Sequence, residues 1–326
     1  MGKSVRRPPT RRQCGHHETD PPAEVSQADK SSSLSTTRPG RGWDENGGMS
    51  AFPEGPEVEL PRGDVTEGVV RIGDTVRRPH QSRSDAVEAY LLHLESVGFD
   101  GAPRWLGRDV TGRDVLTFLD GAVAGSPVDA WATSDDVLPG VARLLRRLHD
   151  ASESFDPPPS LLERGGPTPA LPAREPVIFA HRDLTPQNTV FRDGVAWGVI
   201  DFDLCDHTTR AVDFVNTAMH WVPLCADEDL EPGQEGRDPG LRLSAMYDAY
   251  GRDRFDVDLL LEAAQLRFTG SYARMKWAAE TLGGGWARMW NEGVGDVIQR
   301  RVSWFNGARG DLHRALTEST RPGLAS

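Results

Sequence analysis

The segment FAHRDLTPQNTVF, from Phe179 to Phe191, holds an acid and an amide between two apolar stretches. Asp183 and Asn188 lie five residues apart in it, and a second acid, Asp201, ends the next apolar stretch. Magnesium binds through one or two protein carboxylates together with substrate phosphates. The three side chains therefore predict phosphoryl transfer, with Asn188 and Asp201 holding the metal and Asp183 orienting or deprotonating a hydroxyl group.

A hairpin is expected to position two of these residues, because TVFRDGVAWGVID contains Asp193-Gly194, a preferred dipeptide of two-residue type I′ turns. Counting outward from this turn sets Asn188 opposite Val199 and diagonal to Asp201. Diagonal neighbours are roughly 7–8 Å apart, a gap that two oxygen ligands can close around a hard cation. A slip of one residue would send the side chains to opposite faces. Zinc, which prefers His and Cys, does not fit.

Upstream of this loop the pattern predicts the element order β-β-α-β-β. GVVRIGDTVRRP indicates two strands around a type I′ turn at Gly73-Asp74. SDAVEAYLLHLESVGF has apolar residues at helical spacing, with Ser84 placed as the N-cap and Gly98 as the stop. PRWLGRD and RDVLTFLDG indicate two further strands.

The remaining segments are expected to be mainly helical or unstructured. VLPGVARLLRRLHDA is typical of an amphipathic helix, 157–176 is a Pro/Gly-rich connector, and several helices are expected from about 241 to 318. Residues 1–48 are rich in Arg, Pro, Ser, Thr and Gly and nearly lack large apolar side chains, which predicts disorder.

The composition restricts the class of protein and its location. No apolar run approaches the roughly 18 residues of a membrane-spanning helix, and the N-terminus lacks the apolar stretch of a secretory signal. Three cysteines without short paired spacing indicate a reducing compartment. The net charge of −12 argues against a nucleic-acid partner. A cytoplasmic protein that binds neither nucleic acid nor membrane is expected, and its oligomeric state stays open.

Two motifs carry a family resemblance. HRDLTPQN resembles the catalytic-loop pattern H-x-D-x-x-x-x-N of the protein-kinase-like superfamily, and VIDFDL resembles the metal-binding strand end that follows it. Together with TTRAVDFVNTAMHWVPL, the block is most similar to the aminoglycoside phosphotransferase family, in which His-Gly-Asp is usual. The resemblance is specific at 181–213 and thin back to about residue 65.

The resemblance implies an α+β fold with the two lobes of a protein kinase. A small antiparallel-sheet N-lobe would occupy 56–121 and a larger, mainly helical C-lobe 122–320. A disordered extension over 1–55 and a tail over 321–326 would flank the lobes.

The resemblance also implies the cofactors and the roles of residues. ATP and Mg²⁺ would be the cofactors, and the γ-phosphoryl group would pass to a hydroxyl of a small molecule. Asp183 would be the catalytic base, and Asn188 and Asp201 would be catalytic through the metal that they hold. Asp203 would assist a second ion, and Asp213 would tie its helix to the catalytic loop.

The N-lobe departs from the family pattern. No lysine lies between Lys30 and Lys276, so the phosphate-binding base of the third strand must be an arginine. Strand alternation sends only one of Arg77 and Arg78 into the cleft, and we favour Arg78. Glu88 is a candidate partner on the helix, one position off the family pattern, and fits an exposed helical glutamate equally well.

Nucleotide contacts other than the arginine are weakly marked. No G-x-G-x-x-G occurs, so any phosphate-covering loop is degenerate. LTFLDG resembles the segment between the lobes, where backbone groups of Phe118, Leu119 and Asp120 would bind the adenine edge.

Arg182 stands where the family has glycine, as in protein kinases. Only eleven residues separate Asp201 from Asp213, which is too few for a protein-kinase activation segment. We therefore expect a local electrostatic partner for Arg182 and a small-molecule substrate.

The identity of the acceptor is left open between several classes. An aminoglycoside or amino sugar is the first choice that the resemblance implies, and the acidic stretch CADEDLEPGQEGRD (225–238) slightly favours a cationic acceptor, although it is also typical of a solvated loop. Kinases of choline, homoserine or a ketosamine share the motif block. A nucleotide-binding pseudokinase that regulates a partner is the alternative outside enzymes, because the lysine is missing and the glycine loop is degenerate.

Overall fold

The computed structural model describes residues 52, 55–60, 66, 68–158, 161 and 165–318. The chain divides into Met1–Gly47 and Gly48–Ser326, and every element below belongs to the second unit. The predicted disordered extension and tail lie outside the described residues, apart from residues 52 and 55.

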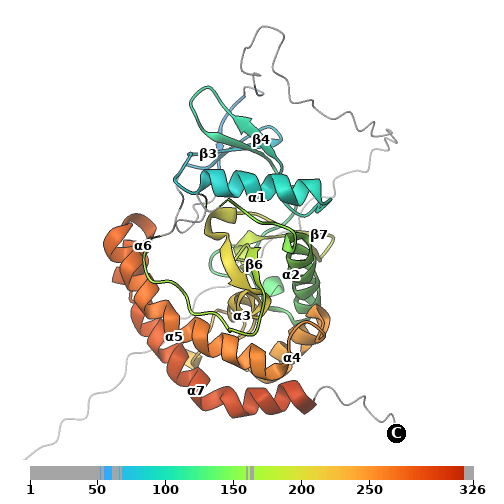
Figure 1. Cartoon of the computed structure of the whole chain (residues 1–326), viewed down its shortest axis with the longest axis vertical. Coiled ribbons are helices and arrows are strands. Elements are labelled where there is room, and N and C mark those ends of the chain that lie inside the picture. Colours follow the sequence, from blue (N-terminus) through green and yellow to red (C-terminus); the bar gives the residue numbers. More distant parts are fainter. Residues whose placement is uncertain are drawn as a thin grey trace, which may run out of the picture. The chain divides into compact units, whose positions relative to one another are not determined.

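A five-stranded antiparallel sheet forms the first part of this unit (Figure 1). In the order β1-β2-β3-β5-β4, its strands are β1 Val58–Glu59, β2 Val70–Ile72, β3 Thr75–Arg78, β5 Asp114–Thr117 and β4 Trp105–Arg108. The predicted hairpin at Gly73-Asp74 is confirmed, with Ile72 opposite Thr75. Only Gly73 of the pair has a positive φ, 58°, which fits a type II′ turn and not the predicted type I′ turn.

Helix α1, Ser84–Ser96, follows the first hairpin and buries its apolar face as the spacing predicts. The stop at Gly98 is confirmed, because this residue has a φ of 79° and donates its N–H to a carbonyl of the last turn. The predicted N-cap is wrong by one residue. Arg83 occupies that position without a side-chain cap, and the Ser84 hydroxyl accepts a hydrogen bond from the Gln81 backbone.

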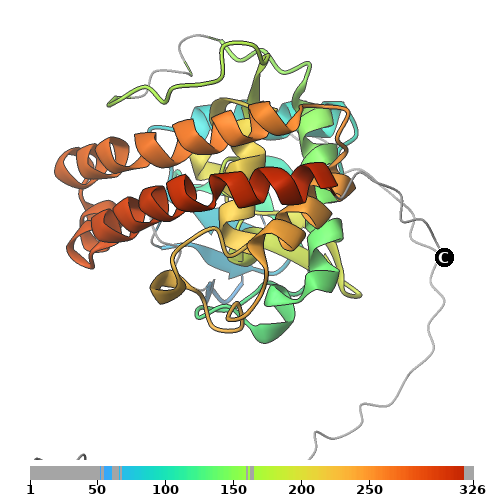
Figure 2. The ribbon, with the colours of Figure 1, turned by 90° about the horizontal axis from the view of Figure 1, so that it is seen from below.

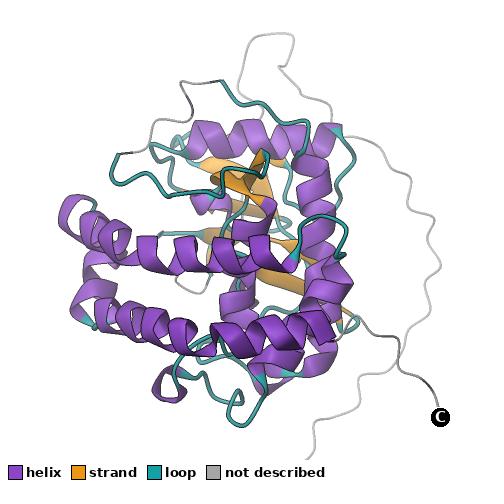
Figure 3. Ribbon diagram, turned by 60° about the horizontal axis from the view of Figure 1, so that its bottom comes forward, coloured by secondary structure: helices purple, strands orange, loops and turns teal. Residues whose placement is uncertain are grey.

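Two short antiparallel sheets of two strands each lie among the helices of the second part (Figure 3). Strand β6, Val177–Ala180, pairs with β9, Asp206–Thr209, and β7, Thr189–Arg192, pairs with β8, Val195–Val199. The predicted β7/β8 turn is confirmed, because Asp193 and Gly194 both have positive φ values, 49° and 74°.

Six helices among the described residues build the rest of the core: α2 Leu138–Ser152, α3 Arg210–Trp221, α4 Pro239–Tyr250, α5 Val257–Thr281, α6 Gly284–Asn291 and α7 Val294–Glu318. Helices α5 and α7 run side by side, and α6 joins them at one end (Figure 2). None of the described helices combines the length and the apolar character that crossing a bilayer requires.

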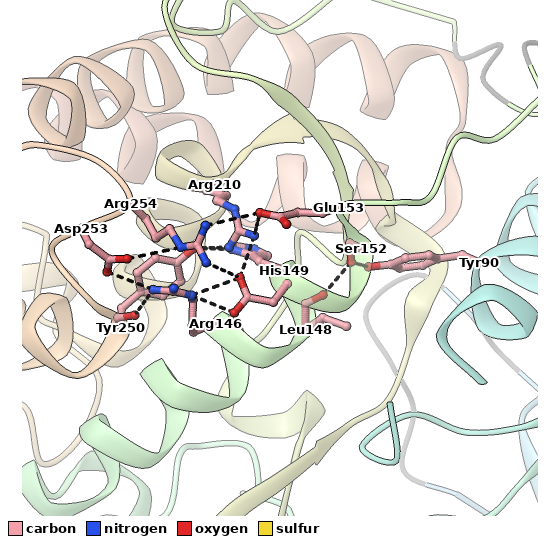
Figure 4. Close-up of polar contacts among 11 residues, drawn as sticks. Tyr90, Arg146, Leu148, His149, Ser152, Glu153, Arg210, Tyr250, Asp253 and Arg254 are labelled. Atoms are coloured by element: carbon pink, nitrogen blue, oxygen red, sulfur yellow. Dashed lines mark hydrogen bonds and ion pairs between the residues drawn. The ribbon is translucent and has the colours of Figure 1, made fainter. Parts of the chain in front are cut away.

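A polar network joins α2, α3 and α4 (Figure 4). The buried Arg210 guanidinium, at the start of α3, donates to Asp150 at 2.7 Å. The His149 ring lies between two partners, 2.8 Å from the Tyr250 hydroxyl and 2.9 Å from Asp213 Oδ2. These contacts fix the first turn of α3, a helix that also contacts the segment between β6 and β7.

Candidate active site

The loop between β6 and β7 brings Asp183 and Asn188 into direct contact. Asn188 Nδ2 donates to Asp183 Oδ2 at 2.9 Å and to the Asp183 carbonyl at 3.0 Å. Asn188 ends the 3₁₀ turn Pro186–Asn188, and Thr185 caps this turn by accepting a hydrogen bond from the Asn188 N–H at 3.2 Å. Proline suits the first position of such a turn because its φ is already fixed there. The amide and the carboxylate therefore lie side by side.

His181 supports this loop from the interior. The fully buried ring accepts a hydrogen bond from the Asp183 N–H at Nδ1, 3.1 Å, and donates from Nε2 to the Ile200 carbonyl, 3.0 Å. This pattern requires a neutral ring with its proton on Nε2. Burial lowers the pKa of His181 to about 4, which keeps the ring neutral at pH 7. One side chain thus links the loop between β6 and β7 to the strand end that carries Asp201.

Helix α3 holds the loop between β6 and β7 through backbone oxygens of that loop. Asn216 Nδ2 donates to the Arg182 carbonyl, and Trp221 Nε1 donates to the Leu184 carbonyl at 2.8 Å. We expected Asp213 to make this tie, but its hydrogen bond goes to α2, as described above. Asn216 and Trp221 were missed, although both lie in the segment that carried the resemblance.

Two residues of the site have strained backbones. Arg182 and Asp201 adopt left-handed φ values of 66° and 62°, a conformation that costs of order 1–3 kcal/mol for a residue other than glycine. The Arg182 guanidinium lies 3.3 Å from Asp206 Oδ2, so the expected local partner is found. Backbone strain of this kind is common at functional sites, where the fold holds particular side chains in fixed directions.

The β7/β8 hairpin reaches Asp201 by a different register from the predicted one. A β-bulge in mid-strand places Thr189 opposite Val199, and the Ile200 N–H donates to the Asn188 carbonyl at 2.9 Å. The prediction that Asn188 lies opposite Val199 is therefore wrong by one residue. The 3₁₀ turn at Asn188 and the left-handed backbone at Asp201 set the directions of these side chains, in place of a shared strand face.

Arg78 faces these acids from the five-stranded sheet. Its guanidinium forms an ion pair with Asp203 and lies 3.9 Å from Asp201 Oδ1, whereas Arg77 turns to the opposite face, 3.8 Å from Asp109. Burial opposes the charge of Arg78, but the carboxylates of Asp203 and Asp201 raise its pKa above the usual value. The favoured residue is thus the one beside the acids. Asp203, our candidate for a second ion, is engaged by this arginine.

The other N-lobe candidates lie nearby with partners of their own. Glu88 lines the same small cavity as Arg78 and Asp203, but its ion-pair partner is Arg108, at 3.7 Å. Burial raises the pKa of Glu88. The structure does not pair Glu88 with Arg78.

The predicted adenine-binding segment follows β5. The Phe118 N–H donates to the Asp74 carbonyl at 2.8 Å, and the Asp120 carbonyl accepts a hydrogen bond from Arg192 at 2.9 Å. Among the described residues, no other backbone hydrogen bond involves this segment.

The donor set fits a magnesium ion that is shared with phosphates. Because Asn188 Nδ2 is used by Asp183, the amide oxygen Oδ1 remains as a ligand. The Asp201 side chain keeps 36% of its surface exposed. The described residues form no group of three or more His, Cys, Asp and Glu side chains that could hold a metal. A site of one amide and one carboxylate would be completed by phosphate and water oxygens, as magnesium prefers.

Comparisons with known proteins also indicate a phosphotransferase. The model of the phosphotransferase enzyme family APH matches residues 167–247. The trifolitoxin immunity protein of Rhizobium leguminosarum bv. trifolii is 36% identical over 263 residues, covering 76% of this chain and 94% of that protein.

Two solved structures are similar in fold, each with a TM-score of 0.52. A choline/ethanolamine kinase family protein from Mesorhizobium loti is 15% identical and covers 81% of this chain and 93% of its own. The GDP complex of aminoglycoside 2'-phosphotransferase-IIIa is 14% identical and covers 76% and 93%. The predicted α+β, two-lobed, protein-kinase-like fold is confirmed.

Proposed function

The chain belongs to the phosphotransferase enzyme family, and from that premise we propose that it transfers the γ-phosphoryl group of ATP to a hydroxyl of a small molecule. The observation that carries the proposal is the contact between Asp183 and Asn188, next to the strand end that holds Asp201. Phosphoryl transfer needs little covalent chemistry from the protein and depends on positioning and charge. Positioning and charge are supplied by a base, two metal ligands and a phosphate-binding cation.

Each side chain has a role in this proposal. Asp183 accepts a hydrogen bond from the acceptor hydroxyl and aims its oxygen at the γ-phosphorus. Asn188 Oδ1 and the Asp201 carboxylate hold Mg²⁺, which neutralises charge on the phosphates when it is bound. Arg78 binds phosphate oxygens through its guanidinium fork. Backbone groups at Phe118 to Asp120 bind the adenine edge.

The proposed setting is protective. The relative's name describes immunity to trifolitoxin, and we propose that this chain likewise protects its cell, by phosphorylating a hydroxyl of a toxin. We place the reaction in the cytoplasm, because the three cysteines of the sequence lack short paired spacing, as expected in a reducing compartment. The inhibitory concentration of trifolitoxin on cells that express the chain tests this setting, and protection by the Asp183→Asn variant would contradict it.

An aminoglycoside acceptor, the first choice from the resemblance, loses the support of the acidic stretch. Glu228 and Asp229 in this stretch both form ion pairs with Arg300 of α7. Asp238 caps the first turn of α4. These acids are used within the fold, so they do not favour a cationic acceptor.

Thermal unfolding with and without Mg·ATP tests the nucleotide site. Ligand at 100 times its Kd stabilises the native state by about 2.7 kcal/mol, so a rise in Tm of several degrees is expected. Asp201→Asn should abolish the magnesium-dependent part of the rise, and asparagine tolerates the left-handed φ of this position.

The matched control is Asp193→Asn, since Asp193 also has a positive φ but lies exposed at the hairpin tip. This variant should respond to Mg·ATP as the parent does. An absent response in the parent, or equal responses in the two variants, would overturn the proposed site.

A further inference from the structure

Beside the catalytic loop, helices α3, α5 and α7 bring together basic side chains whose hydrogen-bond partners are neutral. Arg267 Nε donates to Asn216 Oδ1 at 2.7 Å, and Arg301 Nε donates to the Leu224 carbonyl at 3.2 Å. His220 takes part in none of the hydrogen bonds or ion pairs found among the described residues. We call Arg267, Arg301 and His220 the basic recess.

The three groups lie close enough to perturb one another. Burial, and then the charges of Arg182 and Arg301, lower the pKa of Arg267 to about 10. Burial, and then Arg301 and Arg267, lower the pKa of His220 to about 3, so this ring is a neutral donor and acceptor at pH 7. All three nevertheless keep part of their surface exposed. They are recessed groups with access to solvent, and two of them are positively charged.

The basic recess is coupled to the proposed base by two hydrogen bonds. Asn216 accepts from Arg267 and donates to the carbonyl of Arg182, the residue before Asp183. The Asp183 carboxylate is near enough to raise the pKa of Arg267 but forms no ion pair with it. A molecule bound in the recess therefore has its neighbouring atoms beside Asp183.

Neither Arg267 nor Arg301 forms an ion pair among the described residues, although the carboxylates of Asp183 and Asp213 act to raise the pKa of Arg267 and that of Asp229 acts to raise the pKa of Arg301. The two like charges repel one another, and a bound anion reduces that repulsion. The guanidinium fork matches the two oxygens of a carboxylate or a phosphate. We propose that the basic recess binds an anionic group of the acceptor, so that the substrate is an alcohol that carries a carboxylate or a phosphate. This inference rests on the proposed function. Polycationic acceptors would be excluded by repulsion.

Arg301→Gln is the sharpest variant, because the hydrogen bond of Arg301 goes to the Leu224 carbonyl, away from the loop that carries Asp183. Arg309→Gln is its matched control: the same helix, the same change of charge, and an exposed position. Loss of one charge-assisted hydrogen bond should weaken anion binding about 10- to 100-fold. A purely structural arginine would lower the Tm of the unliganded protein when removed, whereas relief of repulsion should leave that Tm unchanged or raise it.

Binding is measured by calorimetry at constant ionic strength, with magnesium and a non-hydrolysable ATP analogue filling the nucleotide site. The probes are D-glycerate, glycerol 3-phosphate, glycerol and choline. We expect one of the two anions to bind at least tenfold more tightly than glycerol or choline, and their ranking separates a carboxylate from a phosphate. Arg301→Gln should lose this preference and Arg309→Gln should keep it.

Three results would overturn the basic recess: no preference for either anion, a preference for choline, or equal affinities in the two variants. The transfer of phosphate from ATP to the same four alcohols then separates the two proposals. Anion binding that depends on Arg301 without transfer to any alcohol would leave the recess in place and count against the proposed function. Transfer of phosphate to choline or glycerol alone would support the proposed function and count against the basic recess.

Discussion

Arginine side chains have charged partners in one region of this protein and neutral partners in another. In the network between α2, α3 and α4, Arg210 forms ion pairs with both Asp150 and Glu153 (Figure 4). In the basic recess between α3, α5 and α7, Arg267 and Arg301 donate to neutral oxygen atoms. Both regions pack against α3. Ion pairs join the helices in the first region, whereas the two arginines of the recess form none among the described residues, and there we infer that a ligand brings the opposite charge.

The largest expected effect concerns Asp183, which lies beside the recess and has no part in the network. Asp183→Asn should lower kcat about 100- to 10,000-fold, the usual contribution of a positioned base. Binding of Mg·ATP should persist, because the proposed metal ligands remain. Steady-state kinetics with the best acceptor, alongside calorimetry with Mg·ATP, measures both. Retained turnover would remove Asp183 as the base.

Arg210→Gln tests the network side of the comparison. The guanidinium is buried while its two acidic partners are about half exposed, so we expect a loss of about 1–3 kcal/mol in the free energy of unfolding. Denaturant titration measures the loss. The folded variant should keep the acceptor KM of the parent, and a KM effect as large as that of a recess variant would erase the distinction.

Arg267→Gln tests the recess side. The acceptor KM should rise about 10- to 100-fold, through loss of a charge-assisted contact. Because Arg267 also holds Asn216, kcat should fall as well, by a smaller factor. Arg267→Lys keeps the charge but not the fork, and should recover part of the KM effect. An unchanged acceptor KM in both variants would contradict the proposal that Arg267 binds the anionic group of the acceptor.

The smallest effect expected is a pH dependence from His220. Its folded pKa of about 3 lies below the ordinary value of 6.5, so the unfolded chain binds the extra proton. Stability is therefore full above pH 6.5 and falls as the pH drops toward 3. Partial exposure limits the loss to roughly 1–2 kcal/mol. Unfolding of the parent and of His220→Gln across this window should differ, and parallel curves would rule out the burial of a neutral ring.

Local sequence patterns predicted the turns and side-chain directions that a few neighbouring residues determine. The Asp193-Gly194 turn followed from residues that tolerate positive φ. Strand alternation predicted that only one of Arg77 and Arg78 faces the acids, and the favoured Arg78 is the one that does. The register beyond the turn could not be predicted, because the β-bulge leaves no mark in the spacing of apolar residues.

The tie between α3 and the loop was assigned to Asp213 instead of Asn216, because both lie on one helix and only tertiary packing determines which side chain reaches the loop. The basic recess was missed altogether. His220, Arg267 and Arg301 come from three helices that lie far apart in the sequence, so no motif contains them.

The most direct test of the central claim is a crystal structure with magnesium and a non-hydrolysable ATP analogue. We predict that one metal ion is bound by Asn188 Oδ1 and the Asp201 carboxylate. Phosphate oxygens should contact Arg78, and the γ-phosphate should face Asp183. A nucleotide bound elsewhere, or a metal ion held without Asn188 and Asp201, would contradict this prediction.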